Sequence, residues 1–456
     1  MNQQKVVVIG GGPAAITFTR NLRRLAPQSD VLVFRPEPAS MIYCAIPYAM
    51  EGLVAADKVY KGDGLVTETG ARLLRRKVTE VDFAARQVRD DSGESHAYDK
   101  LVIATGAVPI MPPVPGNQAD NVFTVKTQSD MERIMGRLEN KPRKAVVVGA
   151  GAIGIEQAQA YRTLGLEVWL IDSAARVLPH MLDSDMSDPL AAVLRESGIE
   201  LRLGTTVNRL LDGAGTAAAP GKDGAVARVE LSNGESVDLD PATDFVCFAV
   251  GMRPDVELFE DTPLSMERDG IVVDSAMRTS LPDVFAIGDV CAFTSLIDGQ
   301  PLGGKLATNA VPMGKVAARV VAGQAASYAG FVNGAATCVG DWRVGSSGFT
   351  AEFAAARGIE TVVGYAQVQT AFPIMPGAGP LHARVVADHK DGRVVGAQFA
   401  AHTHVTDKVD VVSLAIQQRL TLEELATLSY SSQPWQSHYP AGNAIVDACE
   451  NALEKL

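Results

Sequence analysis

The chain has few cysteines and keeps them far apart. Its five cysteines, at 44, 247, 291, 338 and 449, form no CxxC pair and no cysteine–histidine cluster, and the seven histidines are dispersed. This spacing excludes a disulfide framework and predicts no metal site. An odd number of isolated cysteines favours reduced thiols, one of which is a candidate reactive group.

Long apolar runs and an excess of basic charge are also lacking. No apolar segment approaches the roughly 18–20 residues of a membrane span, and the N-terminal run Val6–Ile9 is too short for a signal peptide. A formal net charge of −12 argues against binding to nucleic acid or to a membrane surface. We therefore expect a cytoplasmic protein, and 456 residues favour roughly three domains.

A dinucleotide-binding fingerprint follows the first predicted strand. Val6–Ile9 leads into G-x-G-x-x-A and a helical pattern that extends to about Leu25. Gly10 permits a tight turn, Gly12 lets a pyrophosphate approach the backbone, and Ala15 permits close helix packing. The phosphates are expected at the helix N-terminus, where unpaired N–H groups favour anions.

The next strand, Val31–Phe34, departs from this pattern. It ends in Arg35 instead of an acidic residue that would bind the ribose hydroxyls. Two interpretations are possible here. Either Glu37 reaches the ribose, or Arg35 contacts the adenosine end of the nucleotide.

A second, complete fingerprint begins after the strand Ala145–Val148. Gly149, Gly151 and Gly154 lead into a helix that carries Ile153 and Glu156. The following strand ends in Asp172, about 20 residues beyond Gly151, which is the spacing of a carboxylate that binds a ribose 2′-OH. The pattern favours NADH over NADPH, while Arg176 leaves NADPH open.

Three further buried strands are predicted to end in small or acidic residues. They deliver Ala104, Thr105 and Gly106, then Gly251, and finally Gly288 and Asp289 before a helix at about 308–322. Ligands bind at such carboxyl ends of strands in open α/β sheets, so Asp289 is a candidate for a ligand hydroxyl.

The chain changes character from about residue 330. Two alternating segments, Leu381–Ala387 and Arg393–Phe399, flank an Asp-Gly pair and predict a hairpin. Helices are expected at Val409–Arg419 and Leu422–Ala426, followed by the polar and aromatic segment 429–440 and a final helix. This region predicts an antiparallel sheet with helices.

The segment Ser40–Tyr48 holds one cysteine directly after the first nucleotide unit. After this segment the chain is expected to be irregular to about residue 65, and strands are expected at Arg72–Val78, Glu80–Phe83 and Arg86–Arg89. A thiol such as Cys44 does redox chemistry only if electrons reach it, and without them it is most simply a small buried hydrophobic side chain. Two nucleotide units in the same chain favour the redox reading, in which Cys44 reacts as a thiolate and forms a mixed disulfide, persulfide or sulfenate.

With these motifs in this order, the chain resembles the FAD- and NAD(P)H-dependent pyridine nucleotide–disulfide oxidoreductases over essentially its whole length. It is similar to their single-cysteine branch, which contains coenzyme A-disulfide reductases, NADH oxidases and peroxidases, and persulfide or polysulfide reductases. The pattern S-[FY]-x-x-C-[GA]-x-P-Y of that branch is met at Ser40, Cys44, Ala45, Pro47 and Tyr48, with Met41 in place of the aromatic residue.

The resemblance implies an α/β fold with two Rossmann-like dinucleotide-binding domains, for FAD and NAD, and a C-terminal α+β dimerisation domain. The expected segments are an FAD-binding domain at 1–115 and 245–328, an NAD(H)-binding domain at 116–244, and the dimerisation domain at 329–456. FAD and NADH, with NADPH open, are the implied cofactors. The implied cofactor-binding residues also include Pro13, Ser40, Val78 and Ala307, with Glu156 near the nicotinamide–flavin contact.

The resemblance further implies a homodimer with a shared active site. The C-terminal tail would reach the partner's active site, with Tyr430 as the best match for a tyrosine near the cysteine and His438 and Tyr439 as further catalytic candidates.

The acceptor is expected to be a small sulfur compound, coenzyme A species included. Ile374 and Met375 stand where coenzyme A-disulfide reductases carry a tyrosine pair, and Pro13 stands where peroxidases carry a histidine. We favour reduction of a disulfide, persulfide or polysulfide through Cys44. Alternatives are an NADH oxidase or peroxidase that works through a sulfenate, a redox sensor that is reduced once, and a reductase of a protein electron carrier that does not need Cys44.

Overall fold

The computed structural model describes residues 4–456, which divide into two compact units. The first unit consists of Met1–Pro109, Lys126–Gln128 and Met252–Phe331, and the second of Ile110–Val125, Ser129–Gly251 and Val332–Leu456. Because the chain leaves the first unit and returns to it, residues distant in sequence share one nucleotide-binding fold. The four-segment domain division drawn from the sequence stays a prediction.

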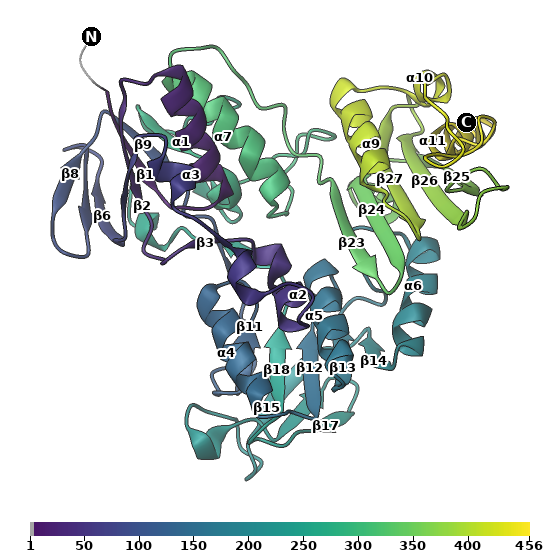
Figure 1. Cartoon of the computed structure of the whole chain (residues 1–456), viewed down its shortest axis with the longest axis horizontal. Coiled ribbons are helices and arrows are strands. Elements are labelled where there is room, and N and C mark those ends of the chain that lie inside the picture. Colours follow the sequence, from purple (N-terminus) through teal and green to yellow (C-terminus); the bar gives the residue numbers. More distant parts are fainter. Residues whose placement is uncertain (1–3) are drawn as a thin grey trace. The chain divides into compact units, whose positions relative to one another are not determined.

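The first unit is built on a five-stranded parallel sheet of order β22-β9-β1-β2-β5. Helix α1 (Pro13–Leu25) packs beside α7 (Ala307–Val321), as Figure 1 shows. The strands are β1 (Lys5–Ile9), β2 (Asp30–Phe34), β5 (Arg72–Leu74), β9 (Lys100–Ile103) and β22 (Val284–Ala286). Its strands are nearly all apolar and buried, as expected when helices or loops cover both faces of a parallel sheet.

Smaller elements complete the first unit. They are the pairs β3 (Ser40–Met41) with β4 (Tyr60–Lys61), β10 (Ala107–Pro109) with β19 (Met252–Pro254) and β20 (Met266–Glu267) with β21 (Gly270–Ile271), the sheet β6 (Val78–Asp82), β7 (Gln87–Asp90) and β8 (Ser95–Ala97), and helices α2 (Ile46–Met50) and α3 (Gly64–Thr67).

Two local expectations were wrong here. The stretch after the segment Ser40–Tyr48 is expected to be irregular to about residue 65, but it contains the end of α2, a 3₁₀ turn at Ala56–Val59, strand β4 and the start of α3. Pro47 lies in the first turn of α2, where its fixed φ suits a helix start. The strand expected at Arg72–Val78 ends at Leu74, because the exposed residues Arg75 to Lys77 interrupt it before β6 begins.

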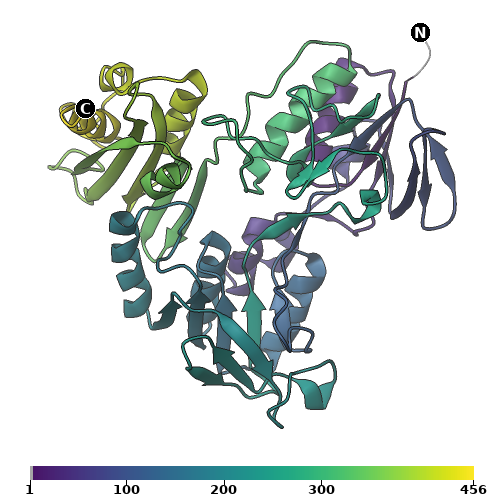
Figure 2. The same cartoon turned by 180° about the vertical axis from the view of Figure 1, so that it is seen from behind.

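The second unit contains another five-stranded parallel sheet, of order β11-β18-β12-β13-β14 (Figure 2). The elements are β11 (Val122–Thr124), α4 (Gln128–Glu139), β12 (Lys144–Val148), α5 (Ala152–Thr163), β13 (Glu167–Asp172), α6 (Ser184–Glu196), β14 (Ile199–Leu203) and β18 (Phe245–Phe248). A three-stranded sheet of β15 (Val207–Leu211), β16 (Arg228–Leu231) and β17 (Ser236–Asp238) adds its apolar face to the same core.

The second unit also holds an antiparallel sheet of order β23-β24-β27-β26-β25. Helices α9 (Thr406–Gln418) and α11 (Ala444–Leu453) pack on this sheet, and the predicted hairpin is formed by β26 and β27. The remaining elements are β23 (Ala335–Val339), β24 (Trp342–Gly348), α8 (Ala351–Ala356), β25 (Thr361–Gln369), β26 (Pro380–Asp388), β27 (Val394–Ala401) and α10 (Leu422–Ala426).

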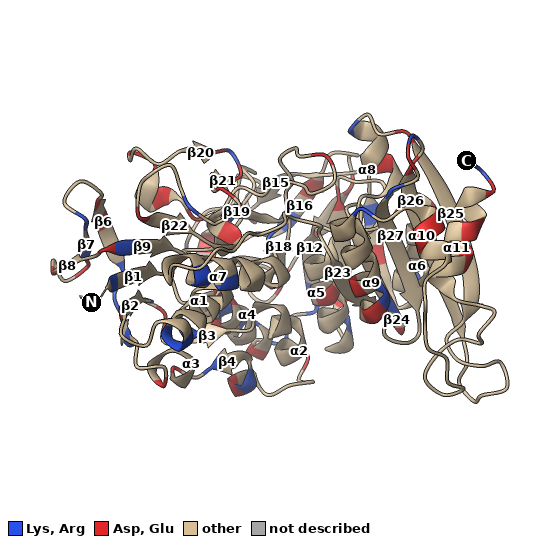
Figure 3. Ribbon diagram, turned by 90° about the horizontal axis from the view of Figure 1, so that it is seen from above, with Lys and Arg blue, Asp and Glu red and all other residues tan. Residues whose placement is uncertain are grey.

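The predicted fold class is thereby confirmed, with two parallel nucleotide-binding sheets and a C-terminal antiparallel sheet with helices. Acidic and basic residues are interspersed along both units (Figure 3). Over residues 4–456, no helix is long and apolar enough to cross a membrane.

Candidate active site

The first fingerprint forms a tight turn between β1 and α1. Gly10 has a φ of +121°, and a Cβ there would lie 2.1 Å from the carbonyl oxygen of Ala104. A Cβ on Gly12 would instead meet nothing within 4 Å, and no side chain caps the N-terminus of α1. The turn therefore leaves open space and unpaired N–H groups where a pyrophosphate would bind. Pro13 occupies the first turn of α1, and Ala15 is buried behind it.

Arg35 is engaged inside the protein. It is 3% exposed, and its guanidinium forms an ion pair of 2.6 Å with Asp63. The same group donates to the backbone oxygens of Glu37, at 3.0 Å, and Pro38, at 3.1 Å. Its methylene groups fill the space above Gly11, because a Cβ there would lie 2.3 Å from the Arg35 Cδ. Arg35 thus shapes the loop, while a nucleotide contact by Arg35 or by the exposed Glu37 stays a prediction.

Asp289 is a half-buried carboxylate just beyond the carboxyl end of β22. Its Oδ1 has no hydrogen-bond partner among the described residues, and the Nζ of Lys126 lies 3.9 Å from its Oδ2. Burial raises the pKa of Asp289, against the opposite effect of Lys126 and Lys305. Such an acceptor is costly to bury unless a donor reaches it, and a ligand hydroxyl would supply one.

Other buried polar atoms of the same unit also lack a hydrogen-bond partner among the described residues. The buried Ser40 hydroxyl and the Asn309 amide nitrogen also have no partner within residues 4–456. Together with the turn at Gly10 and the N-terminus of α7 at Ala307, they supply donors and acceptors for a polar cofactor. The residues present therefore fit FAD, which would bring the phosphates and ribityl hydroxyls that these groups can bind.

We expect Asp289→Asn to stabilise the FAD-free protein and to weaken FAD binding. The pKa of Asp289 is higher in the folded than in the unfolded protein. The contribution of this group to the free energy of unfolding is therefore present at low pH and is lost as the pH rises through the folded-state pKa. At pH 7 the ionised carboxylate thus destabilises the folded protein. The amide removes this penalty but loses the anionic acceptor. The midpoint temperature of thermal unfolding of the apoprotein at pH 7 should rise by about 2 °C for each kcal/mol of stability recovered. The FAD content of the purified protein should fall. A higher FAD content would contradict the assignment.

Cys44 is the accessible thiol of the chain. It lies in a 3₁₀ turn, Tyr43–Ala45, that leads into α2, and its side chain is exposed. Cys247, Cys291 and Cys449 are buried, and burial raises the pKa of the Cys247 and Cys449 thiols to about 12. These buried thiols are poor nucleophiles at neutral pH, and Cys338 is partly buried, which leaves Cys44 as the most accessible candidate for the redox centre.

Lys126 was not singled out by the sequence. It follows β11 and carries no motif, yet its Nζ lies 5.4 Å from the centre of the Tyr43 ring and beside Asp289. Burial lowers its pKa, and Asp289 opposes that shift. A cation thus lies beside the residue that precedes Cys44, a position that only the return of residues 126–128 to the first unit creates.

The remaining strand ends of the first unit are turns in which a glycine has a positive φ. Gly106 and Gly288 have φ angles of +82° and +78°, and the Thr105 hydroxyl donates to the Asp255 carbonyl at 2.7 Å. Val78 is buried at the start of β6. Their predicted cofactor contacts stay predictions.

The second fingerprint has the same construction as the first. Gly149 has a φ of +111°, and a Cβ on Gly154 would lie 1.8 Å from the Gly149 carbonyl oxygen. Gly151 begins helix α5, Ile153 is 40% exposed on its first turn, and Gly251 has a φ of +113°. Glycine is therefore required where the loop, strand and helix meet.

Asp172 holds this loop in place. Its carboxylate accepts hydrogen bonds from the Ala150 N–H at 2.5 Å and the Ala174 N–H at 2.7 Å. Arg176 is engaged elsewhere, because it bonds the carbonyls of Leu182 and Pro179 and pairs with Glu352. A guanidinium so engaged is poorly placed for a 2′-phosphate, which supports a preference for NADH.

We expect Asp172→Ala to raise the KM for NADH about tenfold to a hundredfold. A lost hydrogen bond to a charged group is worth about 1.5–3 kcal/mol, and each 1.4 kcal/mol is about a tenfold change. Asp172→Asn is the matched control, because it keeps one acceptor oxygen for the loop N–H groups. Steady-state kinetics with NADH and NADPH should show a loss specific to NADH. An unchanged KM in the alanine variant would exclude Asp172 from ribose binding.

Glu156 links helix α5 to the C-terminal sheet. Its carboxylate accepts a hydrogen bond from the Thr337 hydroxyl at 2.7 Å, while the Gln159 side chain bonds Cys338 and Gly340. Because Thr337 lies on β23, the strand orients the helix that carries Glu156. Its place near the nicotinamide stays a prediction.

The three predicted tail residues come together in the second unit. The Tyr430 hydroxyl donates to the Pro440 carbonyl at 2.6 Å, and its ring lies 5.5 Å from that of His438. Tyr439 packs at 5.2 Å against Phe372, whose N–H donates to the Pro434 carbonyl. The His438 Nε2 is buried and has no partner among the described residues, and burial lowers the pKa of this ring.

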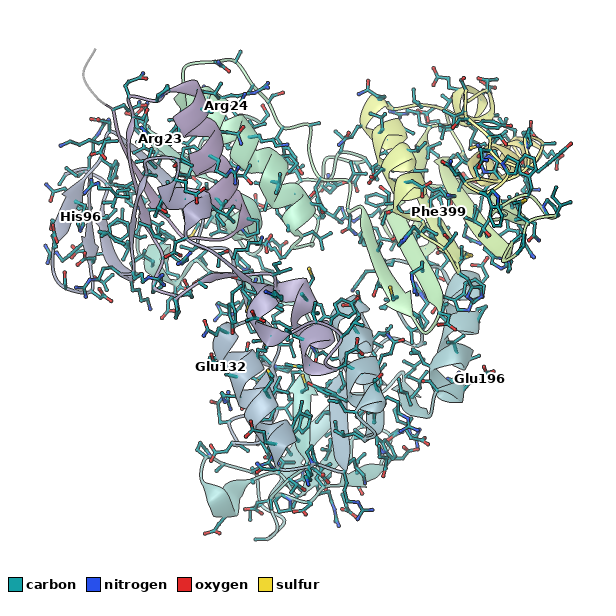
Figure 4. The ribbon with its side chains drawn as sticks, in the orientation of Figure 1. Arg23, Arg24, His96, Glu132, Glu196 and Phe399 are labelled. Atoms are coloured by element: carbon teal, nitrogen blue, oxygen red, sulfur yellow. The ribbon has the colours of Figure 1, made fainter. Side chains whose placement is uncertain are left out.

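A group with metal-ligand geometry also went unnoticed in the sequence. Asp90, Glu94 and His96 place one ligand atom each within 4.8 Å of one another in the β7–β8 hairpin. Of the three, His96 is labelled in Figure 4. Asp90 accepts bonds from the Ser92 hydroxyl and N–H, and it also contacts His96. These contacts, Ser92 first, hold the Asp90 pKa well below its usual range, so internal hydrogen bonds account for the group.

These features define a dinucleotide-dependent redox enzyme with a single accessible thiol. Residues 4–314 match the pyridine nucleotide-disulphide oxidoreductase family, and residues 335–439 match the dimerisation domain of that family. The chain belongs to the pyridine nucleotide-disulphide oxidoreductases.

Its relatives carry two kinds of name. An NADH oxidase of Methanocaldococcus jannaschii is 31% identical, with 99% of each chain covered. An NAD(P)H coenzyme A polysulfide/persulfide reductase of Pyrococcus horikoshii is 29% identical, covering 92% of this chain and 93% of the relative. The structure of a NAD-dependent persulfide reductase from A. fulgidus superposes with a TM-score of 0.91 at 29% identity, covering 99% of this chain and 83% of that one.

Family membership confirms several predictions. The protein is an oxidoreductase that uses FAD and NADH or NADPH, and its C-terminal region is a dimerisation domain. The predicted resemblance to the single-cysteine branch is confirmed by relatives named as NADH oxidase and as persulfide reductase.

Proposed function

We propose that this enzyme uses NADH to reduce a disulfide, persulfide or polysulfide acceptor through Cys44. The observation that carries the proposal is that Cys44 is the one exposed thiol of the five, so a second cysteine cannot easily resolve its oxidised form. A relative named as a coenzyme A polysulfide/persulfide reductase, aligned over 92% of the chain, supports a sulfur acceptor.

The proposed reaction balances with one hydride donor. The Cys44 thiolate attacks an acceptor R–S–S–R′, forms a Cys44–S–S–R bond and releases R′–S⁻. Two electrons from NADH then cleave that bond into the Cys44 thiolate and R–S⁻, so NADH, H⁺ and R–S–S–R′ give NAD⁺, R–SH and R′–SH. FAD would be held by Gly10, Gly12 and Asp289, and it would supply the hydride-accepting and electron-transferring chemistry when bound.

A second candidate is an NADH oxidase or peroxidase, favoured by the name of the relative from M. jannaschii. In that reaction peroxide oxidises Cys44 to a sulfenate, and two electrons with protons return the thiolate and water. Pro13 in the first turn of α1 supplies no acid or base for that chemistry.

Anaerobic NADH oxidation by purified FAD-loaded enzyme tests the choice. Polysulfide, coenzyme A persulfide, coenzyme A disulfide and hydrogen peroxide are offered separately, and oxygen is then readmitted. Faster turnover with a sulfur acceptor supports the proposal, whereas turnover only with peroxide or oxygen supports the oxidase. Reduction of the flavin once, with no turnover on any acceptor, would indicate a redox sensor.

We further propose a homodimer in which the tail of each chain completes the partner's active site. Four large apolar side chains are exposed on the two loops around Phe372 and Pro434: Ile374 at 83%, Trp435 at 63%, Tyr439 at 55% and Tyr430 at 40%. A contiguous apolar patch of this kind usually marks an interface. Tyr430, His438 and Tyr439 would then lie close to the partner's Cys44.

Trp435→Glu is expected to shift the protein from dimer to monomer, because it places a charge in the centre of this patch. Sedimentation at several protein concentrations measures the shift, and activity should fall in parallel. Leu164→Glu, at a 41% exposed apolar residue at the end of α5, is the matched control. A Trp435→Glu variant that stays dimeric and fully active would refute the shared site.

A further inference from the structure

Four side chains form an aromatic recess on the C-terminal sheet, within the second unit. Trp342 on β24, His382 on β26 and Tyr365 on β25 surround the small Ala400 of β27. The ring centres of Trp342 and His382 lie 5.7 Å apart, and those of Tyr365 and His382 lie 6.1 Å apart. Because Ala400 lies between larger neighbours, the sheet is hollowed here. The cavity has a volume of about 290 Å³.

Helix α6 forms the other wall of this aromatic recess. Met186, Pro189 and Leu190 contribute apolar groups, and Asp185 contributes a carboxylate. The recess is therefore a half-open hollow between one helix and one sheet, lined by rings and aliphatic carbon with one charged residue in its lining. None of these side chains takes part in the proposed redox chemistry.

The charge around the recess is negative. Arg384 pairs with Asp183 at 3.0 Å and also with Asp185, so one guanidinium is shared by two carboxylates. Asp183 is 2% exposed, whereas Asp185 is 52% exposed and can meet a ligand. Burial raises the pKa of Tyr365, and the charge of Asp185, which lines the same recess, raises it further.

The rings themselves carry no charge at neutral pH. Burial lowers the pKa of His382, and the pKa of Tyr365 is raised. The Tyr365 hydroxyl and the His382 Nδ1 share a hydrogen bond of 2.5 Å, which keeps both rings in place. Trp342 also packs against His402, with ring centres 4.2 Å apart. Neutral, preorganised π faces beside a carboxylate attract cations and disfavour anions.

From this arrangement we propose that the aromatic recess is a binding site for a small organic ammonium cation. The indole of Trp342 and the phenol of Tyr365 would contact the alkyl groups of the cation, and Asp185 would balance its charge. Anionic ligands such as nucleotides are poorly suited, because the guanidinium of Arg384, beside Asp185, is already paired with two carboxylates. The site is separate from the cofactor and thiol chemistry, and it is independent of which acceptor the enzyme reduces.

The test uses two probes of similar shape that differ in charge. Choline carries a trimethylammonium group, and 3,3-dimethylbutan-1-ol carries an uncharged tert-butyl group in its place. Isothermal titration of the FAD-loaded enzyme should show saturable choline binding with at least about tenfold higher affinity than for the alcohol. Trp342→Ala should lower the choline affinity at least about tenfold, and Asp185→Asn should lower it severalfold.

Two further variants distinguish loss of the binding site from loss of folding. Ala400→Leu fills the recess without removing a ring and should abolish choline binding. Trp169→Phe, which changes a tryptophan outside the recess, should leave binding unchanged. NADH oxidation by Asp185→Asn is expected to match that of the unmodified enzyme. Equal affinity for choline and the alcohol, no saturable choline binding, or choline binding that survives both Trp342→Ala and Ala400→Leu would overturn the proposal.

Discussion

Replacing Cys44 by serine is expected to reduce NADH-dependent turnover of a sulfur acceptor at least about 1,000-fold, because a hydroxyl cannot form the mixed disulfide. The variant should keep its FAD and its overall fold, since the Cys44 side chain is exposed and packs in no core. A single addition of NADH should still bleach the flavin absorbance, because that step precedes the thiol chemistry. Steady-state rates and anaerobic flavin reduction, measured on the same preparation, separate the two steps.

Cys338→Ser is the matched control for this variant. Cys338 is only partly buried on β23 and contributes its backbone carbonyl, not its thiol, to the bond from Gln159. Its replacement should leave turnover within about twofold. Full activity of Cys44→Ser would instead support a reductase of a protein electron carrier and would end the proposal of thiol chemistry.

Gly10→Ala is expected to have the second large effect, a loss of both FAD and stability. The added Cβ would lie 2.1 Å from the Ala104 carbonyl, at a φ of +121° that alanine rarely adopts. Backbone strain of this kind costs about 1–3 kcal/mol before the clash is counted. The FAD content of the purified protein and its midpoint of thermal unfolding should both fall.

Gly12→Ala separates the effect on FAD binding from the effect on stability. Gly12 has a φ of −79°, and a Cβ there would meet nothing within 4 Å, so the protein should fold normally. It would nevertheless occupy the space where a pyrophosphate approaches the backbone, and FAD should bind more weakly. If Gly10→Ala retained FAD and stability, the close approach of β1 and Ala104 would not be the reason that glycine is required there.

The two nucleotide fingerprints can be recognised from the sequence, because each lies in one short strand–turn–helix segment whose chemistry is local. The sequence predicts Gly10 for a tight turn and Gly154 as part of the second fingerprint, and the structure adds the close backbone approach at both positions. The spacing alone predicts a role for Asp172, and its carboxylate accepts a hydrogen bond from the Ala150 N–H in the second fingerprint loop. The isolation of Cys44 among five cysteines was equally visible, and its exposure matches that of a reactive thiol.

Tertiary structure alone decided what depends on residues far apart in the chain. Nothing near Arg35 indicates that Asp63 binds its guanidinium, nor that Lys126 returns to lie beside Asp289 and Tyr43. The aromatic recess joins side chains from four strands and one helix, none of which forms a motif. Local patterns report backbone conformation and periodicity, whereas ion pairs, buried charges and cavities arise only when packing brings distant side chains together.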